Sequence, residues 1–402
     1  MYKHYIILIL ISFYLNAGVI KKIVLNGNKI TQNTIILETL NHQIGDTINI
    51  NLAQQDLQAL INLGPFEDAI IHPADSIYYI YLFEYPKIIY SPILDKDDVK
   101  GTSAGLSTRF NNINGKNKKI LFDIQIGKKT IFNLNYLDPK HHYNKDTLRV
   151  SLKNEFFENI ETDYSLNQFS FNINYLLPLK NNKNTLGSEF ELSNNELKYL
   201  YNDTYSRFTE LSATIFFRRN NLNNINNNLT GNIFNIDYTL LLFSDFYPTL
   251  NKITIKNKLY IPLSNIKNSG RLVFTNQGIC YFSNNIAIFN KTYIASENYV
   301  RGYSIEPSDN PISIRNKLKW NNIITSSIQL EIPLYKNTES LFFFDYGLGT
   351  NDYLNWELEN KIRSYGFGFR YEIKKLIGID FCIGLNKFSH KEFHVIVNYK
   401  YY

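Results

Sequence analysis

Apolar and polar side chains alternate along most of this chain. In Lys119–Ile126, Ile120 and Phe122 lie on one face of an extended segment. Asp123 and Gln125 lie on the opposite face. Segments of about 10 residues with this pattern recur from residue 104 onward, separated by clusters of Asn, Lys, Gly and Pro. The pattern is typical of a mainly β fold, and it predicts a transmembrane antiparallel β-barrel over residues 102–402.

We expect about sixteen strands, because a single-chain bacterial barrel has an even number of strands. The widest gap between expected strands lies between Ala287 and Ile328, which predicts a long loop after the eleventh strand. The expected strand centres are Leu106, Phe122, Leu134, Ser151, Phe169, Phe190, Ala213, Tyr238, Ile255, Val273, Ala287, Ile328, Phe343, Phe367, Phe381 and Val397.

The composition is compatible with such a barrel. The 402 residues are 44% hydrophobic, yet the mean hydropathy is −0.25. Past residue 15 there is no apolar run near the ~18 residues that a membrane-spanning helix needs. The 30 Tyr and 28 Phe residues suit the aromatic girdles of a barrel. A soluble strand-rich protein with a bias toward Asn, Ile, Lys and Tyr would share this composition. A propeller, however, would show an internal repeat of ~40–50 residues, and we find none.

Charge and reactive residues argue against several classes of function. The net charge of +6 is spread along the chain without a dense basic block, so we expect no nucleic-acid partner. Cys280 and Cys382 are far apart, and they predict neither a disulfide framework nor a zinc site. The histidine pairs His141–His142 and His390 with His394 lack a third metal ligand. We therefore expect no enzyme, no metal and no cofactor.

The N-terminus has the pattern of a secretory signal peptide over residues 1–17. Lys3 and His4 form a short polar region, Tyr5–Leu15 is apolar, and Leu15-Asn16-Ala17 is a candidate cleavage site. Export without a membrane helix leaves the periplasm, the outer membrane or the medium.

Residues 18–88 predict a small α+β domain in the order β-α-α-β-β. Val19–Leu25 is a strand pattern, Thr31 is a candidate helix cap, and Gly64-Pro65 ends a second helix. Two strands follow, Phe66–His72 and Ile77–Tyr85. Residues 89–101, with Ser91-Pro92 and the charge run from Asp95 to Asp98, predict a polar linker.

Four short motifs in this region resemble a polypeptide-transport-associated (POTRA) domain. They are a strand that ends in Gly-Asn, a central Gly-Asp, Gly-x-Phe before the second strand, and Glu-x-Pro at the end. The residues that carry them are Gly27, Asn28, Gly45, Asp46, Gly64, Phe66, Glu84 and Pro86. After Pro86 no second Gly-Asn strand follows, so we expect one POTRA repeat.

The long loop carries Val300-Arg301-Gly302-Tyr303, which we call the loop tip. Because residues i and i+2 of a strand share a face and carboxylates avoid lipid, we expect the charged residues of the strands after it to face the lumen. Arg301 could then pair with Asp345 or Glu331. Small residues on the same inner face would make room for the loop. The expected lumen partners are Asp345, Glu331, Gly347, Gly366, Gly368 and Arg370.

These motifs resemble the outer-membrane protein assembly family typified by BamA, also called the bacterial surface antigen family. The match consists of the loop tip, Glu331 before Pro333-Leu334, Phe343-x-Asp345-x-Gly347, Gly366–Arg370 and Ile379-Asp380. The resemblance implies an Arg301–Asp345 pair. It also implies a barrel in the bacterial outer membrane with its POTRA domain in the periplasm.

The implied function is insertion of unfolded outer-membrane proteins at a seam between the first and last strands, near Gly105 and Tyr399. The partners are such clients and outer-membrane lipids, and the resemblance also allows accessory periplasmic lipoproteins. The alternatives are a two-partner-secretion-type transporter, which passes a polypeptide through the lumen, and a passive porin or adhesion antigen. The last strand pattern, Phe393–Tyr402, ends in an aromatic residue, but its apolar face runs through Tyr401.

Overall fold

The structure is a computed structural model in which two compact units are formed. The first contains the described part of Met1–Tyr90 together with Thr108–Leu121, and the second that of Ser91–Ser107 together with Phe122–Tyr401. The described residues are 18–97, 100–139, 146–159, 164–179, 183–199, 204–225, 228–246, 250–264, 266, 269–283, 286–303, 318–335, 337–357, 360–373 and 377–399. The expected signal peptide, His141–His142 and Tyr401–Tyr402 lie outside them.

The N-terminal α+β unit has the element order expected from the sequence. Its elements are β1 (Lys22–Asn26), α2 (Asn33–Leu37), α3 (Ile50–Leu63), β2 (Phe66–Ala74) and β3 (Ile77–Glu84). The sheet order is β1-β3-β2, with β1 parallel and β2 antiparallel to β3. Both helices pack their apolar sides on this sheet, in a core that includes Ile36, Leu60 and Tyr78. In the described part of the chain, no helix is long and apolar enough to cross a membrane.

Two details of this unit differ from the sequence-based prediction. The residue before α2 is Gln32, without a side-chain cap, because the Thr31 hydroxyl donates instead to Glu84 at 2.5 Å. The turn between two strands of the barrel, around Asn112 and Gly115, belongs to this unit. There the Asn112 side chain donates to Thr31 Oγ1 at 2.7 Å, and Gln32 N donates to Gly115 O at 3.0 Å.

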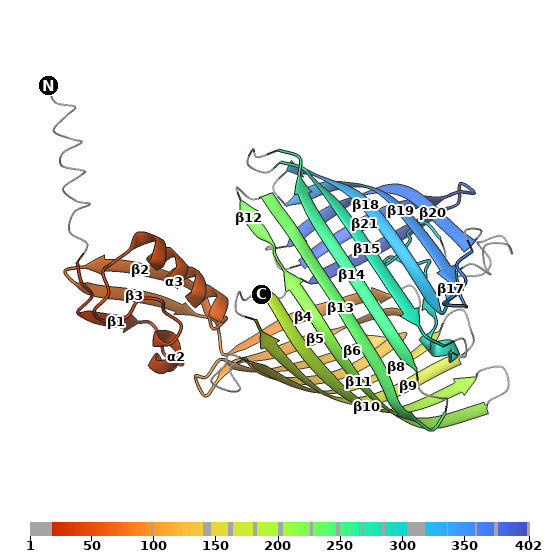
Figure 1. The fold of residues 1–402 in the computed structure, drawn as a ribbon, viewed down its shortest axis with the longest axis horizontal. Coiled ribbons are helices and arrows are strands. Elements are labelled where there is room, and N and C mark those ends of the chain that lie inside the picture. The colour runs from red at the N-terminus through yellow and green to blue at the C-terminus, as the bar shows by residue number, and fades with distance from the viewer. Residues whose placement is uncertain are drawn as a thin grey trace. The chain divides into compact units, whose positions relative to one another are not determined.

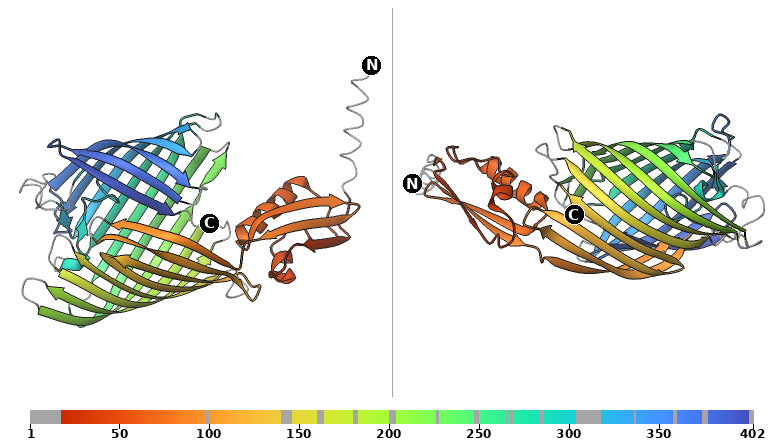
Figure 2. Two further views of the ribbon diagram at one scale, coloured as in Figure 1. Left: turned by 180° about the vertical axis from the view of Figure 1, so that it is seen from behind. Right: turned by 90° about the horizontal axis from the view of Figure 1, so that it is seen from below.

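The second unit is a closed antiparallel barrel, and in the part that the structure describes it has sixteen long strands (Figures 1 and 2). A short strand, β12 (Asn223–Ile225), pairs with β13 beside the β11–β13 connection. The long strands are β4 (Ile88–Asp97), β5 (Gly101–Ile113), β6 (Lys118–Gly127), β7 (Lys129–Asp138), β8 (Thr147–Asn159), β9 (Tyr164–Pro178), β10 (Asn184–Tyr199), β11 (Thr204–Asn220), β13 (Asn228–Ser244), β14 (Asn251–Pro262), β15 (Arg271–Tyr281), β18 (Asn322–Tyr335), β19 (Thr338–Thr350), β20 (Lys361–Ile373), β21 (Ile377–Asn386) and β22 (Lys391–Tyr399).

The alternation predicted for the strands is present in the barrel. On β20, Tyr365, Phe367 and Phe369 are 59%, 44% and 50% exposed, as side chains of the outer face should be. On the inner face between them, Gly368 is buried and Gly366 is partly buried. Outward aromatic residues and inward small or charged residues therefore come from a single period-2 pattern.

The strand prediction was wrong at two places. One strand was missed and one was expected where none forms, so the expected number of strands still agrees with the structure. Residues 89–101 are not only a linker, because Ile88–Asp97 forms β4, the first barrel strand. The charge run in β4 suggested a loop, but Asp95 pairs with Lys129 of β7 at 2.6 Å. Ala287, expected as a strand centre, precedes the 3₁₀ helix η1 (Ile288–Asn290). Ile286 is buried there against Leu241 of β13 and Tyr281 of β15.

The first barrel strand changes the position of the seam. Because β22 is followed by β4 in the closed order, the first and last strands meet as β4 and β22. The seam is therefore not at Gly105, which lies one strand further on, in β5.

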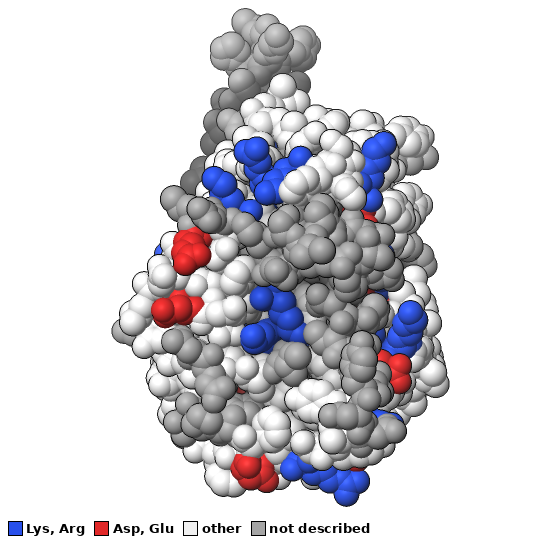
Figure 3. Space-filling view, turned by 90° about the vertical axis from the view of Figure 1, so that its right-hand side faces the viewer, with Lys and Arg blue, Asp and Glu red and all other residues white. Residues whose placement is uncertain are grey.

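Charged residues at one end of the molecule do not form a patch of a single sign. In the view of Figure 3, Lys and Arg side chains are interspersed with Asp and Glu side chains.

Candidate functional site: a loop held inside the barrel

The described part of the long loop between β15 and β18 packs against the inner face of the barrel. It contains η1 and a two-residue ladder of β16 (Thr292–Tyr293) with β17 (Lys319–Trp320). Its apolar side chains form a buried cluster with inward side chains of the wall. The cluster consists of Ile294, Ala295, Val300, Tyr303, Leu318, Trp320, Ile323 and Ile362. This packing fixes the loop tip against strands β18–β22.

Arg301 and Asp345 form a bidentate ion pair at the centre of the site. Arg301 Nε lies 2.8 Å from Asp345 Oδ2, and Nη2 lies 2.8 Å from Oδ1. The backbone N–H of Arg301 donates to the same carboxylate at 3.1 Å. The two residues are 7% and 0% exposed, so the pair is buried. Of the two partners that the sequence allowed, the structure places Asp345 against Arg301.

Three further side chains of the wall also contact the guanidinium. Gln329 accepts from Nη1 at 2.9 Å, and Ser327 accepts from Nη2 at 3.2 Å. Ser327 also donates to Asp345 at 2.6 Å, which holds the carboxylate in place. The ring of Phe343 lies under the guanidinium, with its centroid 3.5 Å from Cζ. The charge of Arg301 is thus matched by a carboxylate, two polar oxygens and a ring face.

Inner-face glycines give these groups their space. A Cβ on Gly366 would lie 2.4 Å from the Phe343 ring, so this glycine lets the ring lie against the wall beneath Arg301. A Cβ on Gly347 would lie 2.6 Å from Ile294 and 2.8 Å from Val300, both in the loop. Gly347 therefore leaves space for the loop itself, whereas Gly366 leaves space for the Phe343 ring that lies beneath Arg301. A Cβ on Gly368 would lie 2.8 Å from Cys382 Sγ.

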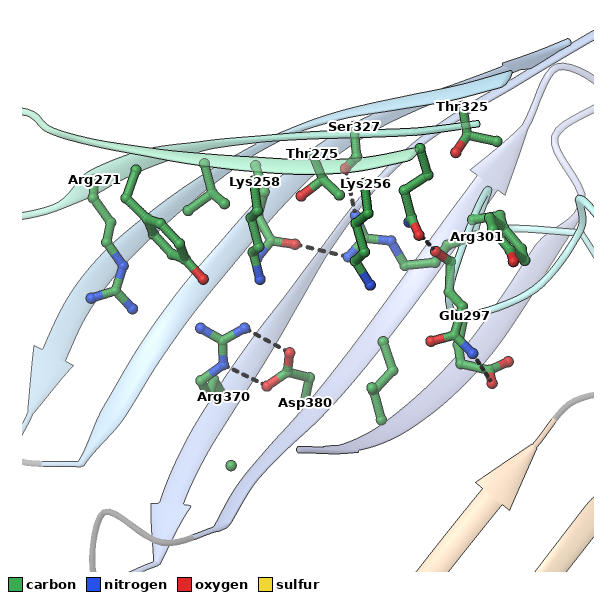
Figure 4. Close-up of a pocket in the computed structure, with 18 of the residues that line it drawn as sticks. Lys256, Lys258, Arg271, Thr275, Glu297, Arg301, Thr325, Ser327, Arg370 and Asp380 are labelled. Atoms are coloured by element: carbon green, nitrogen blue, oxygen red, sulfur yellow. Dashed lines mark hydrogen bonds and ion pairs between the residues drawn. The ribbon is translucent and has the colours of Figure 1, made fainter. Parts of the chain in front are cut away.

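Glu331 belongs to a second buried charge cluster rather than to Arg301. Arg370 Nη1 lies 2.9 Å from Glu331. Arg370 Nε lies 2.6 Å from Asp380, and Figure 4 shows this second pair. Arg271 also contacts Glu331, and it lies 3.0 Å from Glu339. Gln329 joins the two clusters, because its amide donates to Glu331 at 2.7 Å while its oxygen accepts from Arg301. The loop tip therefore binds to one end of a charge network that runs along the wall.

The rest of the loop tip contacts the last three strands. Gly302 has a φ of +87°, which favours glycine, and a Cβ on it would lie 2.9 Å from the backbone of Gly384 in β21. The Gly302 N–H donates to Nε2 of His394 in β22 at 3.0 Å. The Tyr303 hydroxyl donates to the backbone oxygen of Arg363 in β20 at 2.8 Å.

Sequence reasoning did not find His394 and Gly384 as site residues. The sequence argued only against His394 as a metal ligand, and this histidine proves to be 1% exposed beneath the loop tip. Gly384 shares the inner face of β21 with Asp380 and Cys382, and Phe381, on the opposite face, is 43% exposed. From the sequence, this alternation could have predicted that Gly384 lies on the inner face of the barrel. No sequence pattern indicated that His394 would meet Gly302, because their contact spans 92 positions.

A cavity of about 340 Å³ adjoins the loop tip in the lumen (Figure 4). Lys256, Lys258 and Arg271 line it from β14 and β15, and Glu297 and Arg301 line it from the loop. The described part of the lumen next to the loop is therefore polar and predominantly basic.

The N-terminal motif residues have structural roles in their unit. Gly27, Gly45 and Gly64 all have positive φ values, and Gly64 ends α3 in the left-handed conformation. The Glu84 carboxylate accepts from the backbone N–H groups of residues 29–31. The remaining motif residues also have defined places: Asn28 donates to the Thr31 oxygen, Asp46 accepts from the Gln43 N–H, Phe66 is buried, and the Pro86 oxygen accepts from Asn111.

The fold and the site define a class of protein: a sixteen-stranded membrane barrel whose long loop is held inside the lumen by a buried arginine. The model of the Omp85 superfamily domain matches residues 112–387, and the chain belongs to this superfamily. None of the curated proteins matches the chain.

Solved structures of two kinds of protein resemble it. BamA from Haemophilus ducreyi, in a form that lacks POTRA domains 1–3, has a TM-score of 0.66 at 15% identity and covers 94% of this chain and 84% of its own. CdiB from Escherichia coli has a TM-score of 0.63 at 13% identity and covers 95% and 75%. CdiB from Acinetobacter baumannii has a TM-score of 0.60 at 14% identity, with coverage of 95% and 73%. At these identities the likeness is one of fold.

Proposed function

We propose that the protein inserts unfolded β-barrel proteins into the bacterial outer membrane. In this proposal the N-terminal α+β unit is a periplasmic POTRA domain that captures a client by strand addition at a sheet edge. The client then enters the membrane at the seam between β4 and β22. Membrane lipids and unfolded barrel proteins are the partners, and accessory periplasmic lipoproteins would be further ones.

The proposal rests on the position of the loop tip. It is held against the wall of strands β18–β22, and the last of these strands, β22, is one of the two strands of the seam. Arg301 is fixed by Asp345, and Gly302 reaches His394 of β22. An unpaired strand in lipid is unfavourable because its backbone N–H and C=O groups have no partners. A seam that opens beside an incoming strand supplies those partners during insertion.

The two seam strands also suit an opening role. In the described residues β4 has 10 residues and β22 has 9, like β6 and β7 with 10 each, whereas β11 and β13 have 17 each. Pro92 in β4 lacks a backbone N–H, which removes one donor from this strand. Each interstrand hydrogen bond contributes about 0.5–1.5 kcal/mol, so a short pairing separates more easily than the long ones.

The second candidate is a two-partner-secretion-type transporter that passes a polypeptide through the lumen. The resemblance in fold to CdiB and the basic cavity beside the loop favour this alternative. It requires the loop to leave the lumen, whereas insertion at the seam requires only that β4 and β22 separate.

Client insertion into liposomes tests the proposal. The purified protein should accelerate folding of an unfolded barrel client, and Arg301→Ala and Asp345→Ala should abolish that acceleration. Arg207→Ala is the matched control, because Arg207 pairs with Glu196 on the surface with 78% of its side chain exposed. No acceleration by the unaltered protein, with ion conductance through its lumen instead, would support transport.

A disulfide between β4 and β22 separates the two candidates further. Cysteines placed opposite each other on these strands, in a chain with Cys280→Ser and Cys382→Ser, should block insertion when oxidised and restore it when reduced. Full insertion activity in the oxidised protein would exclude the seam as the route. Transport through the lumen would survive oxidation.

A further inference from the structure

The loop tip contacts every strand from β18 to β22. Arg301 contacts β18 and β19, Tyr303 contacts β20, and Gly302 contacts β21 and β22. The last of these strands pairs with β4 and closes the barrel. The contact between Gly302 and β22 therefore joins the loop to the seam.

His394 makes this contact with a buried ring nitrogen. Its Nε2 lies 3.0 Å from the Gly302 nitrogen, and the residue is 1% exposed. Because a backbone N–H can only donate, Nε2 must act as the acceptor and carries no proton in this contact. A ring that lacked an acceptor would leave the Gly302 N–H without this partner in a buried site.

Two glycines bring the backbone of the loop tip within reach of His394. A Cβ on Gly384 would lie 2.5 Å from the Gly302 nitrogen, so any other residue at this position of β21 would push the loop tip away. Cys382, two residues earlier on the same face, lies opposite His394 in the β21–β22 ladder. The loop tip thus lies on the backbone of β21 and donates to the next strand.

We propose that His394 is a positioning residue that couples the docked loop to the strand that closes the barrel. While the loop is docked, the Gly302–His394 hydrogen bond keeps β22 an ordered edge strand with which an incoming strand can pair. Release of the loop removes this restraint, so β22 frays and no longer offers an ordered edge to a client. This inference rests on the proposed function, since it assigns to one residue the control of the seam at which clients would enter.

Amide hydrogen exchange of β22, measured on the protein in liposomes without a client, tests the coupling. Arg301→Ala should release the loop and raise exchange in β22 at least tenfold while leaving β13 unchanged. His394→Phe keeps a ring but removes the acceptor, and it should raise β22 exchange roughly 3- to 10-fold. His394→Gln retains an acceptor and should restore much of the protection.

A double-mutant cycle distinguishes coupling from simple packing of β22. If His394 acts through the loop, His394→Phe should have no further effect on β22 exchange when Arg301→Ala is already present. Equal effects of His394→Phe with and without Arg301→Ala would overturn the inference, as would unchanged β22 exchange in Arg301→Ala.

The proposed function is judged by a different readout. If the cycle shows coupling but the unaltered protein does not accelerate client folding, the inference stands and the insertion function falls. If clients insert but β22 exchange does not respond to the loop, the inference falls and the insertion function stands.

Discussion

Two walls of the barrel share the period-2 alternation of outward and inward side chains, but their inner faces have different roles. On the docking wall, β18–β22, inward side chains bind the loop tip, as Asp345 binds Arg301 and His394 binds Gly302. On the plain wall, β8–β11, inner-face amides bond within the wall, as Asn174 does to Glu189 and Asn195 does to Glu210. The barrel itself needs only a polar inner face, whereas the docked loop needs particular side chains.

The largest expected difference between the walls comes from removing one buried carboxylate on each. Asp345→Ala leaves Arg301 buried without its partner, which should destabilise loop docking by about 3–5 kcal/mol. Glu155→Ala on the plain wall removes a carboxylate whose partners, Lys100 and Lys153, have side chains 31% and 39% exposed. Because these lysines reach water, the cost should be about 1 kcal/mol or less.

Labelling of Cys382 by a soluble thiol reagent measures loop docking, because Cys382 is 0% exposed and lies opposite His394. Cys280→Ser provides the background. Since about 1.4 kcal/mol corresponds to tenfold, Asp345→Ala should raise the labelling rate by roughly 100-fold or more. Glu155→Ala should change it by less than tenfold. Equal rates in the two variants would show that the docking wall is no more specialised than the plain wall.

A second comparison uses two glycines, one with close neighbours on its side-chain side and one with open space there. Gly366→Ala would place a Cβ 2.1 Å from the backbone oxygen of Ile383 in β21 and 2.4 Å from the Phe343 ring. It should displace the ring and Arg301 and disturb the pairing of β20 with β21, at a cost of about 1–3 kcal/mol. Gly278→Ala in β15 is the matched control, because its Cβ would have its nearest neighbour at 3.8 Å. We expect up to about 100-fold faster Cys382 labelling in the first variant and no change in the second. Unchanged labelling in Gly366→Ala would mean that Phe343 does not support Arg301.

The sequence predicts the strands of the barrel better than it predicts the contacts of the docking wall. Period-2 alternation is local, so fifteen expected strand centres fall within barrel strands, while the charged β4 was taken for a linker. The inward carboxylates allowed Arg301 to pair with Asp345 or Glu331, and the resemblance to the BamA-type family implied Asp345. The contact of Gly302 with His394 depends on how close two backbones approach, and neither residue type indicates that in the sequence.

The smallest contrast concerns the hydroxyl of Tyr303. It donates to the Arg363 oxygen at 2.8 Å, and the Arg363 N–H donates to it at 3.2 Å, in a residue that is 1% exposed. Tyr303→Phe keeps the ring in the buried cluster but leaves both backbone groups without this partner, which should cost about 0.5–1.5 kcal/mol. Cys382 labelling should accelerate by up to about tenfold.

Tyr205→Phe is the control on the plain wall, because Tyr205 in β11 is 59% exposed and its hydroxyl can be replaced without burying an unpaired group. Its labelling rate should equal that of the unaltered protein. If Tyr303→Phe also left the rate unchanged, the loop tip would be held by Arg301 and Gly302 alone. The loop tip would then contact β20 only through packing of the Tyr303 ring. The docking wall would bind the loop tip through the polar contacts of Arg301 and Gly302, without a third from Tyr303.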